Sequence, residues 1–322
     1  MNLIEFESQL NQWGRTQVPF LFLVDFEMEN LLAWKIKDVP KDILVSINGF
    51  SNTSSTTQNL ETASLTKNPV SFSNYKSKFD LVQERIRFGD SYLTNLTIKT
   101  KININCSLEE LFSANVAKYQ LCWKNKFLVF SPETFVQIRN KKIYSFPMKG
   151  TIDASLPDAE QIILSDQKEL SEHVTIVDLI RNDLSLVAEN VQVNRFRYIE
   201  KIKTNQKDLL QVSSEIVGSL PGDYLKHIGS ILISLLPAGS ISGAPKKKTL
   251  QIIREAEKEK RSFYTGVFGY FDGKNLDSSV MIRFIEQEDG TFYYRSGGGI
   301  TSQSEVEKEY QEAIDKIYVP IY

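Results

Sequence analysis

The chain has 322 residues, 41% hydrophobic and 24% charged, and this balance is typical of a globular protein with a sizeable core. Its 38 basic side chains are nearly matched by 40 acidic ones, and a net charge of −2 provides no bulk attraction for nucleic acid or acidic membranes. The two cysteines, Cys106 and Cys122, form no metal-binding or redox motif, which fits a reducing compartment.

The N-terminal third of the chain begins without a targeting signal. Residues 1–9 contain two glutamates and no basic segment before an apolar run, so we expect no signal peptide. The apolar run at 19–24 is too short to span a bilayer, and we expect a cytoplasmic protein with no membrane partner. Between 19 and 45 short apolar runs alternate with polar breaks, which predicts strands and turns. The Ser-, Thr- and Asn-rich stretch 48–68 predicts a long loop.

The rest of the chain mixes helical and strand patterns. Apolar residues at helical spacing predict helices at 75–88, 159–187, 224–235, 246–258 and 304–318. Strands are predicted at 92–100, 127–138, 142–146, 266–272, 279–286 and 291–296. Because strands and helices do not alternate regularly, the pattern indicates an α+β protein with a largely antiparallel sheet. We predict one catalytic unit at 75–322 and a reduced N-terminal portion at 1–74 packed on it.

A lysine in an unusual setting is the first candidate for chemistry. Lys149 lies in Pro147-Met148-Lys149-Gly150-Thr151, where Pro and Gly fix the backbone around the amine. The upstream turn Ser131-Pro132-Glu133 presents a carboxylate that could face it. Two readings stay open: a reactive amine beside an acid, or a structural ion pair between Lys149 and Glu133.

Two predicted helices carry carboxylates that could hold a cation. On the last helix Glu305, Glu309 and Glu312 share one stripe, which is either a solvated acidic face or a ligand set for Mg²⁺. Glu172 lies in a helix with apolar residues almost all round, and a buried carboxylate needs a cation nearby. The sequence supports two environments for Glu172 equally: a metal ion shared with the last helix, or an ion pair with a basic side chain.

Three further features are suited to binding anions. The segment 239–246 opens directly into a helix, so its amides and the Ser240 hydroxyl stand at a positive helix end. A second glycine-rich turn, Gly297-Gly298-Gly299, offers amides without side chains. Arg283 has apolar neighbours and suits a carboxylate. The alternatives are tight turns for the glycines and a core ion pair for Arg283.

Taken in order, these segments resemble the chorismate-utilising enzymes, and most closely their aminodeoxychorismate synthase branch, over about residues 75–317. The resemblance implies two largely antiparallel sheets packed with helices in a layered sandwich. It also implies a general acid-base at Glu133 and Mg²⁺ ligands at Glu172 and Glu312, with Glu309 close by. The substrate-binding residues that it implies are Thr151, Ser240, Tyr264, Arg283, Gly297, Gly298 and Gly299.

Within the family, Lys149 indicates the branch. Anthranilate synthases usually read Pro-Ile-Ala-Gly-Thr here, whereas the aminodeoxychorismate enzymes read Pro-Ile-Lys-Gly-Thr. The resemblance implies that the lysine, with its pKa lowered, attacks C2 of chorismate as the C4 hydroxyl leaves, and that ammonia then enters at C4. The chain has no Cys-His-Glu amidotransferase segment, so a glutamine amidotransferase subunit is the implied ammonia source.

Two positions depart from the family pattern. Leu93 stands where relatives commonly have Gln, and Gln211 stands where many have a His that can carry a proton. Two alternatives to aminodeoxychorismate synthase activity stay open. One is anthranilate or isochorismate/salicylate synthase activity, and the other is a non-catalytic relative that binds chorismate.

Overall fold

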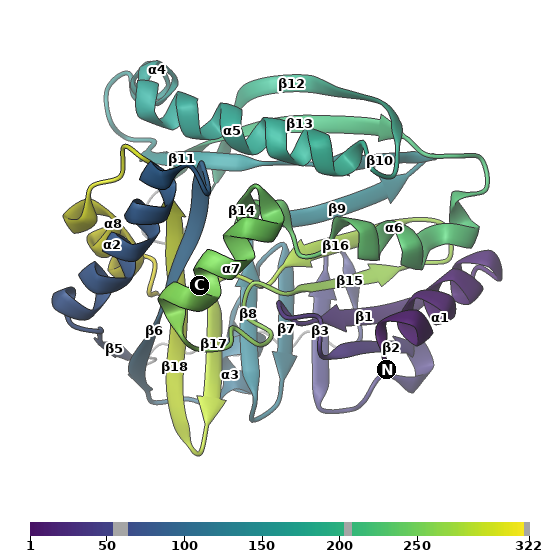
Figure 1. Cartoon of the computed structure of the whole chain (residues 1–322). Coiled ribbons are helices and arrows are strands. Elements are labelled where there is room, and N and C mark those ends of the chain that lie inside the picture. The colour runs from purple at the N-terminus through teal and green to yellow at the C-terminus, as the bar shows by residue number, and fades with distance from the viewer. Residues whose placement is uncertain (54–63, 203–207, 319–322) are drawn as a thin grey trace.

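Two antiparallel sheets form the centre of the computed structural model, which describes residues 1–53, 64–202 and 208–318 (Figure 1). In pairing order, sheet A consists of β11 (Met148–Asp153), β13 (Leu209–Ser219), β10 (Lys142–Ser145), β9 (Thr134–Arg139), β16 (Leu276–Val280), β15 (Val267–Phe271), β1 (Phe20–Val24) and β2 (Leu31–Lys35), with β12 (Glu189–Ile202) beside β13. Sheet B consists of β14 (Gly243–Ala244), β6 (Leu93–Ile104), β18 (Thr291–Ile300), β17 (Phe284–Glu288), β8 (Phe127–Ser131), β7 (Tyr119–Trp123), β3 (Ile43–Ile47) and β4 (Phe50–Ser51), with β5 (Leu65–Asn68) beside β6. This architecture confirms the predicted α+β class.

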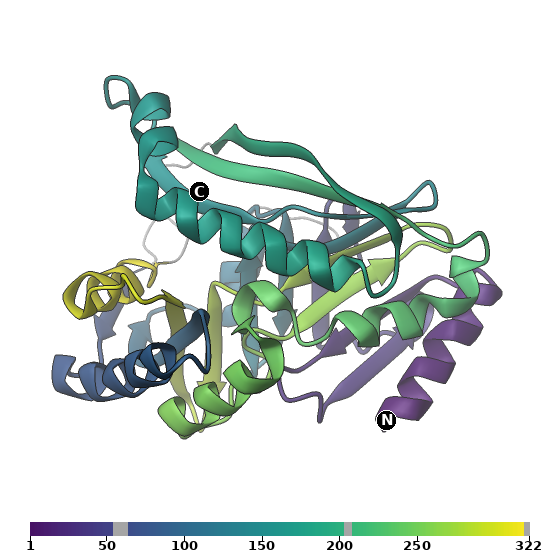
Figure 2. The same cartoon turned by 45° about the horizontal axis from the view of Figure 1, so that its top comes forward.

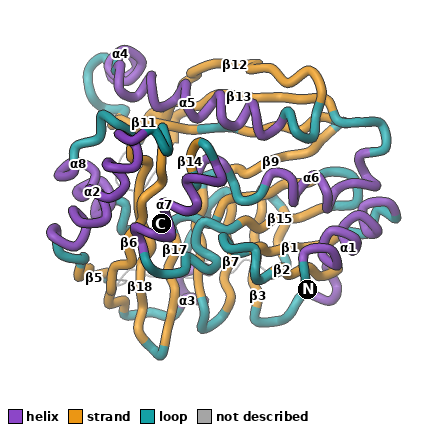
Figure 3. Tube along the Cα trace, in the orientation of Figure 1, coloured by secondary structure: helices purple, strands orange, loops and turns teal. Residues whose placement is uncertain are grey.

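Helices pack against both sheets and fill the ends of the molecule, as the colouring by secondary structure shows (Figure 3). The helices are α1 (Leu3–Arg15), α2 (Phe72–Phe88), α3 (Leu108–Ala114), α4 (Ala159–Ser165), α5 (Gln167–Leu184), α6 (Ile228–Leu235), α7 (Lys246–Glu257) and α8 (Val306–Asp315). Short 3₁₀ turns are η1 (Ile36–Asp38), η2 (Tyr224–His227) and η3 (Gly239–Ile241).

The strand β1 shows why the core has two layers. All five of its residues are buried, so its sequence reads as a continuous apolar run and not as an alternating one. Phe20, Phe22 and Val24 pack in a cluster with residues of α1, α5 and α6. Leu21 and Leu23 point the other way, into a cluster with residues of β3, β7 and β8. Sheet A is therefore covered by helices on one face and by sheet B on the other.

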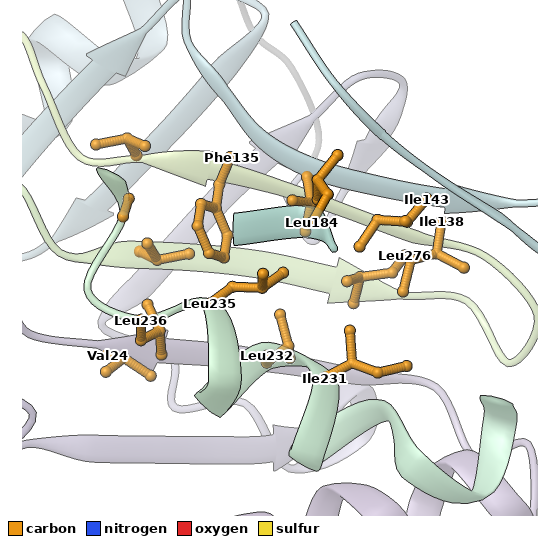
Figure 4. Close-up of a cluster of buried hydrophobic side chains, with 14 of the residues drawn as sticks. Val24, Phe135, Ile138, Ile143, Leu184, Ile231, Leu232, Leu235, Leu236 and Leu276 are labelled. Carbon is orange, nitrogen blue, oxygen red and sulfur yellow. The ribbon is translucent and has the colours of Figure 1, made fainter. Parts of the chain in front are cut away.

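The helix-covered face of sheet A holds α5, which carries Glu172. Leu184 of α5 packs with Ile138 and Ile143 of the sheet and with Leu232 and Leu235 of α6 (Figure 4). Figure 2 shows α5 lying over one face of this sheet, roughly along the direction of its neighbouring strands. The buried apolar stripe of α5 fixes its rotation, and the buried Glu172 of the same helix lies against Lys149 of β11.

Three helices cover one face of β6 and β18. Residues of α2, α7 and α8 form one cluster with Leu96, Ile98 and Ile300. Helix α8 consequently lies beside β18 and near the start of α5 (Figure 1), and Lys168 of α5 contacts Glu309 of α8. The two carboxylate-bearing helices thus come from opposite sheets and meet at one end of the molecule.

Several predicted elements are confirmed with small shifts at their ends. The helix predicted at 75–88 is α2, and Gly89 ends it in the left-handed conformation with φ 90°. The helix predicted at 246–258 is α7, and the helix predicted at 304–318 is α8. The strand predicted at 92–100 is β6, which continues to Ile104.

Other predictions were wrong at particular residues. The helix predicted at 159–187 is broken at Asp166, because the Asp166 carboxylate caps a new helix by accepting from the Glu169 amide at 3.0 Å. The strand predicted at 279–286 is interrupted between β16 and β17, where Arg283 has φ 53°. The 48–68 loop contains β4 and β5, and its residues 54–63 lie outside the described residues. The elements that no sequence pattern predicted include α1, α3, β7, β11, β12 and β13.

The N-terminal residues supply strands to both sheets. β1 pairs with β15 in sheet A, and β3 pairs with β7 in sheet B. The division into 1–74 and 75–322 stays a prediction. Within the described residues, the stretch Tyr224–Ile241 is apolar and long enough to cross a membrane, and 61% of it is buried inside the protein.

Candidate active site

A bulge in β11 turns Lys149 away from its sheet. Met148 pairs with Ser213 and Thr151 pairs with Gln211, so two residues of β11 oppose a single residue of β13. The extra residue is accommodated by Gly150 at φ 81°, a conformation that glycine adopts without strain. The Lys149 amine then reaches α5, where its Nζ lies 2.5 Å from Oε2 of Glu172. The Pro-Met-Lys-Gly motif is therefore the sequence of a bulge that projects an amine.

One pocket brings the main predicted residues together. It is lined by Leu93 (β6), Glu133 (between β8 and β9), Lys149 (β11), Glu172 (α5), Ser240 (η3) and Gly299 (β18), among others. Both sheets and a helix thus contribute to a single concave site at the end where they meet. A pocket with an amine, two carboxylates and a hydroxyl is suited to acid-base or nucleophilic chemistry on a small polar molecule.

The acid and the amine in this pocket have different partners. The expected pair between Lys149 and Glu133 is not formed, because the Glu133 carboxylate accepts a hydrogen bond from the Ser240 hydroxyl. Burial raises the pKa of Glu133, although the Ser240 hydrogen bond works in the opposite direction. A carboxyl group with a raised pKa is suited to donating a proton.

The pKa of Lys149 shifts in the direction opposite to the predicted one. Burial favours the neutral amine, but the carboxylate of Glu172 beside it outweighs this effect and raises the pKa of Lys149. The reason for the error is that the sequence did not show which carboxylate would lie next to the amine. The resting site therefore holds Lys149 as an ammonium paired with Glu172.

Three glutamates gather at the edge of the pocket, and lysines separate them. Glu172 and Glu309 are only 4% and 5% exposed, so neither belongs to a solvated acidic face. Lys168 bridges them, with its Nζ 3.7 Å from Oε1 of Glu172 and 3.4 Å from Oε1 of Glu309. Lys316 contacts Glu312, whose side chain is 45% exposed, at 2.6 Å, and this contact outweighs partial desolvation and lowers the pKa of Glu312. The third member of the predicted stripe, Glu305, is exposed and pairs with Lys308.

The three glycines were predicted to form a turn, but they are part of strand β18. Gly297, Gly298 and Gly299 pair with β6, whereas β17 pairs with Thr291–Arg295, so among the described residues no strand lies on the other side of the glycine stretch. A Cβ on Gly298 would lie 3.6 Å from Glu309 Oε2, Glu312 Oε1 and Lys316 Nζ. The absence of side chains lets the ends of α8 side chains approach the strand backbone, and the Gly297 carbonyl accepts from Lys316 at 2.9 Å.

The remaining predicted substrate-binding residues lie outside the pocket lining. Tyr264 is buried in the core between the sheets, and burial raises its pKa to about 12. The Arg283 guanidinium lies over the ring of Tyr318, 5.0 Å from its centre. Thr151 is exposed on β11, and Gln211 stands opposite it on β13. Their predicted roles stay predictions.

Two ion pairs, one partly buried and one fully buried, hold the segment that carries Ser240. Lys246 binds Asp183 of α5 at 2.9 Å, next to Gly239. Arg261 is 0% exposed, pairs with Glu257 at 2.6 Å, and donates to the carbonyls of Ile241 and Asn95. Because Asn95 also lines the pocket, Arg261 fixes two sides of the site without touching its interior.

Lys168 and Lys316 were not predicted as site residues, although their spacing from the predicted metal ligands is visible in the sequence. Lys168 precedes Glu172 by four residues, and Lys316 follows Glu312 by four, which places each pair on one helix face. The same rule applied to the predicted metal ligands would have found both lysines.

The donor chemistry of this cluster fits a hard divalent cation. Within 1–53, 64–202 and 208–318 no three acidic, His or Cys side chains are already close enough to hold a metal, because the lysines separate the glutamates. The oxygens of Glu309 and Glu312 nevertheless converge near Gly298, and Glu172 is joined to Glu309 through one ammonium group. Carboxylates gathered around a positive charge are the ligands that Mg²⁺ prefers.

Comparison with known proteins decides the family. The chorismate binding enzyme family matches residues 24–321, which is nearly the whole chain and begins earlier than the residue 75 expected from the motifs. The chain belongs to this family. The predicted family membership is therefore confirmed, and the pocket around Lys149 lies within the matched region.

Relatives refine this placement. An uncharacterized PabA-like protein of Haemophilus influenzae is 51% identical over 98% of this chain and 96% of its own length. Aminodeoxychorismate synthase component 1 of Klebsiella aerogenes is 34% identical over 77% of this chain, which spans 57% of that protein. A solved structure described as a putative 2,3-dihydroxybenzoate-specific isochorismate synthase, DhbC, of Bacillus anthracis has a TM-score of 0.75 at 20% identity, covering 98% of this chain and 87% of that one, and supports the fold alone.

Proposed function

We propose that this chorismate-binding enzyme is the synthase subunit that aminates chorismate at C4 to give 4-amino-4-deoxychorismate. The observation that carries the proposal is the position of Lys149, whose amine lines the same pocket as the Glu133 carboxyl group. An alanine at position 149, as in the usual anthranilate motif, would leave this pocket without a nucleophile. The 34% identity to an aminodeoxychorismate synthase component supports the same branch.

Lys149 and Glu133 can carry the reaction without a further protein group. The Lys149 ammonium group first gives one proton to water, and it takes a proton back at the end of the cycle. The neutral amine bonds to C2, the ring double bond shifts, and the C4–oxygen bond breaks while protonated Glu133 gives its proton to the departing hydroxyl, which leaves as water. Ammonia then bonds to C4, the double bond shifts back, and the bond between C2 and Lys149 breaks. The new ammonium group returns one proton to Glu133, so the enzyme is regenerated.

Ser240 positions Glu133 in this scheme. Its hydroxyl donates to one carboxylate oxygen and leaves the other free to face the substrate. Burial of Glu133 keeps a proton on it at a pH where an exposed glutamate would be ionised. The pocket thereby keeps its acid opposite its nucleophile.

Glu172, Glu309 and Glu312 would hold Mg²⁺ at the edge of the pocket. When bound, Mg²⁺ would neutralise and orient the carboxylate attached to the chorismate ring. Arg283 and the strand amides of Gly297–Gly299 are the other groups suited to a carboxylate, since Arg283 has no acidic partner within the described part of the chain. A glutamine amidotransferase subunit would supply ammonia, and the designation of the Klebsiella relative as component 1 is consistent with such a partner.

Product analysis tests the proposal. The purified chain is incubated with chorismate, Mg²⁺ and ammonium, and the products are separated by chromatography while pyruvate is assayed in parallel. Aminodeoxychorismate without pyruvate is the expected result. Anthranilate or salicylate with pyruvate would place the chain in a sister branch, and isochorismate would indicate an isomerase. No turnover, even with a glutaminase partner, would indicate a non-catalytic relative.

A further inference from the structure

The carboxylates that would hold the metal are already neutralised by side chains of this chain. Glu172, Glu309 and Glu312 carry three negative charges, and the amines of Lys149, Lys168 and Lys316 lie against them. Glu169 is a further carboxylate beside Lys149 and Glu172, so a divalent cation added to these four carboxylates and three amines would leave one excess positive charge in a partly buried place. A metal that binds to the oxygens contacted by an ammonium group also requires that ammonium group to move away.

Lys168 is the most weakly held of the three amines. Lys149 contacts its carboxylate at 2.5 Å, and Lys316 contacts Glu312 at 2.6 Å and also donates to a backbone carbonyl at 2.9 Å. Lys168 makes only longer contacts, at 3.7 and 3.4 Å, and its side chain is the most exposed of the three at 38%. Its long stem allows the amine to swing into solvent at little cost.

Lys168 also occupies the position that a shared metal needs. Its contacts are to Oε1 of Glu172 on α5 and to Oε1 of Glu309 on α8, one oxygen from each helix. The other oxygen of Glu172 is held by Lys149, so Oε1 is the oxygen through which Glu172 can reach a metal without releasing the amine of the active site.

We propose that Lys168 is a built-in competitor of the divalent cation, which holds Glu172 and Glu309 together in the metal-free enzyme and leaves when the metal binds. The proposal rests on the metal site of the proposed function and deepens it. Lys168 touches neither Lys149 nor Glu133 through any hydrogen bond or ion pair among the described residues, so it acts on the metal and not on the reacting atoms.

Direct metal binding tests the proposal without catalysis. Mg²⁺ is titrated into the whole chain in the absence of chorismate, by calorimetry at fixed pH and ionic strength, for the wild type and for Lys168→Met. The matched control is Lys308→Met, which removes the same charge from α8 but breaks only the exposed pair with Glu305. We expect Lys168→Met to lower the Kd for Mg²⁺ by on the order of tenfold and Lys308→Met to change it less than about twofold.

A second measurement follows the lysine itself. Acetylation of amines by a water-soluble reagent, read by mass spectrometry, should proceed several-fold faster at Lys168 when saturating Mg²⁺ is present. The rate at Lys308 should stay constant. Unchanged labelling of Lys168 at saturating Mg²⁺ would overturn the proposal, because the amine would then remain between the carboxylates.

The outcomes separate this inference from the metal site itself. If Glu172→Gln and Glu309→Gln both weaken Mg²⁺ binding but Lys168→Met binds no better than Lys308→Met, Lys168 is not a competitor and the metal site stands. If Lys168→Met binds more weakly, the lysine organises the carboxylates, which also overturns the proposal. If neither glutamine variant changes binding, the metal site of the proposed function fails as well.

Discussion

Lys149 and Glu172 form an ion pair in the pocket lining, with Nζ and Oε2 2.5 Å apart, and this contact joins β11 to α5. The proposed nucleophile is thereby bound to a proposed metal ligand, so the reacting amine and the cation site form one unit. A change in either residue will affect the other, and variants at the two positions should not be additive.

Replacing Lys149 tests the nucleophile. Lys149→Ala should abolish aminodeoxychorismate formation, and ammonia entering directly at C2 would instead give a small amount of anthranilate with pyruvate. The measurement is chromatography of products from wild type and variant. Full retention of aminodeoxychorismate formation would show that Lys149 is not the nucleophile. Lys308→Met, which alters an exposed lysine of α8, serves as a control for charge and folding.

Replacing Glu133 tests the acid. Glu133→Gln keeps the size and can still accept from Ser240, but it cannot transfer a proton, so kcat should fall by about 10²–10⁴-fold. Ser240→Ala, which removes the hydrogen bond that lowers the pKa of Glu133, should reduce kcat less and extend activity toward higher pH. Steady-state kinetics over a pH series compares the two. An equal loss of kcat in the two variants would mean that the activity depends on the placement of the Glu133 side chain and not specifically on its proton transfer.

Replacing the glutamates one at a time tests the metal ligands. Glu172→Gln and Glu312→Gln should each raise the Mg²⁺ concentration for half-maximal activity by about tenfold or more, because a neutral amide is a poor ligand for a hard cation. Glu305→Gln is the matched control on α8, since that side chain is exposed and lies outside the cluster. Identical Mg²⁺ titrations for all three variants and the wild type would remove the glutamates as ligands.

Neighbouring glycines of β18 should respond differently to alanine. A Cβ on Gly297 would lie 2.2 Å from the Leu96 carbonyl oxygen, so Gly297→Ala should destabilise the fold by about 1–3 kcal/mol. A Cβ on Gly298 would meet side-chain atoms at 3.6 Å, an ordinary contact, so Gly298→Ala should fold normally. Urea unfolding of both variants makes the comparison. Equal stability of the two variants would contradict the geometry of this strand.

The buried Arg261 should matter for stability and for the shape of the pocket. Arg261→Met leaves the Glu257 carboxylate buried without its cation and frees the carbonyls of Ile241 and Asn95. The loss should be about 3–5 kcal/mol in unfolding free energy. Thermal unfolding measures it, and the double variant Arg261→Met with Glu257→Leu should recover part of the loss. A single variant as stable as the wild type would show that the pair is dispensable.

The sequence by itself determined the features that depend on near neighbours along the chain. The apolar spacing and the glycine stop of α2, the start and end of α7, and the Pro-Met-Lys-Gly motif that forms the bulge could all be read locally, because their conformations depend on residues within a few positions. The family motifs were likewise contiguous. They indicated the α+β class and the chorismate-binding family, which the sheets and the comparison then confirmed.

Only the tertiary structure decided which charged groups meet. Lys149 pairs with Glu172 because the packing of α5 on sheet A places Glu172 next to the bulge of β11. The Glu133 carboxylate instead accepts a hydrogen bond from Ser240. The glycines of β18 form a strand because β6 is there to pair with them. Contacts between segments distant in sequence depend on how buried faces pack together, and charged side chains take the partners that this packing leaves within reach.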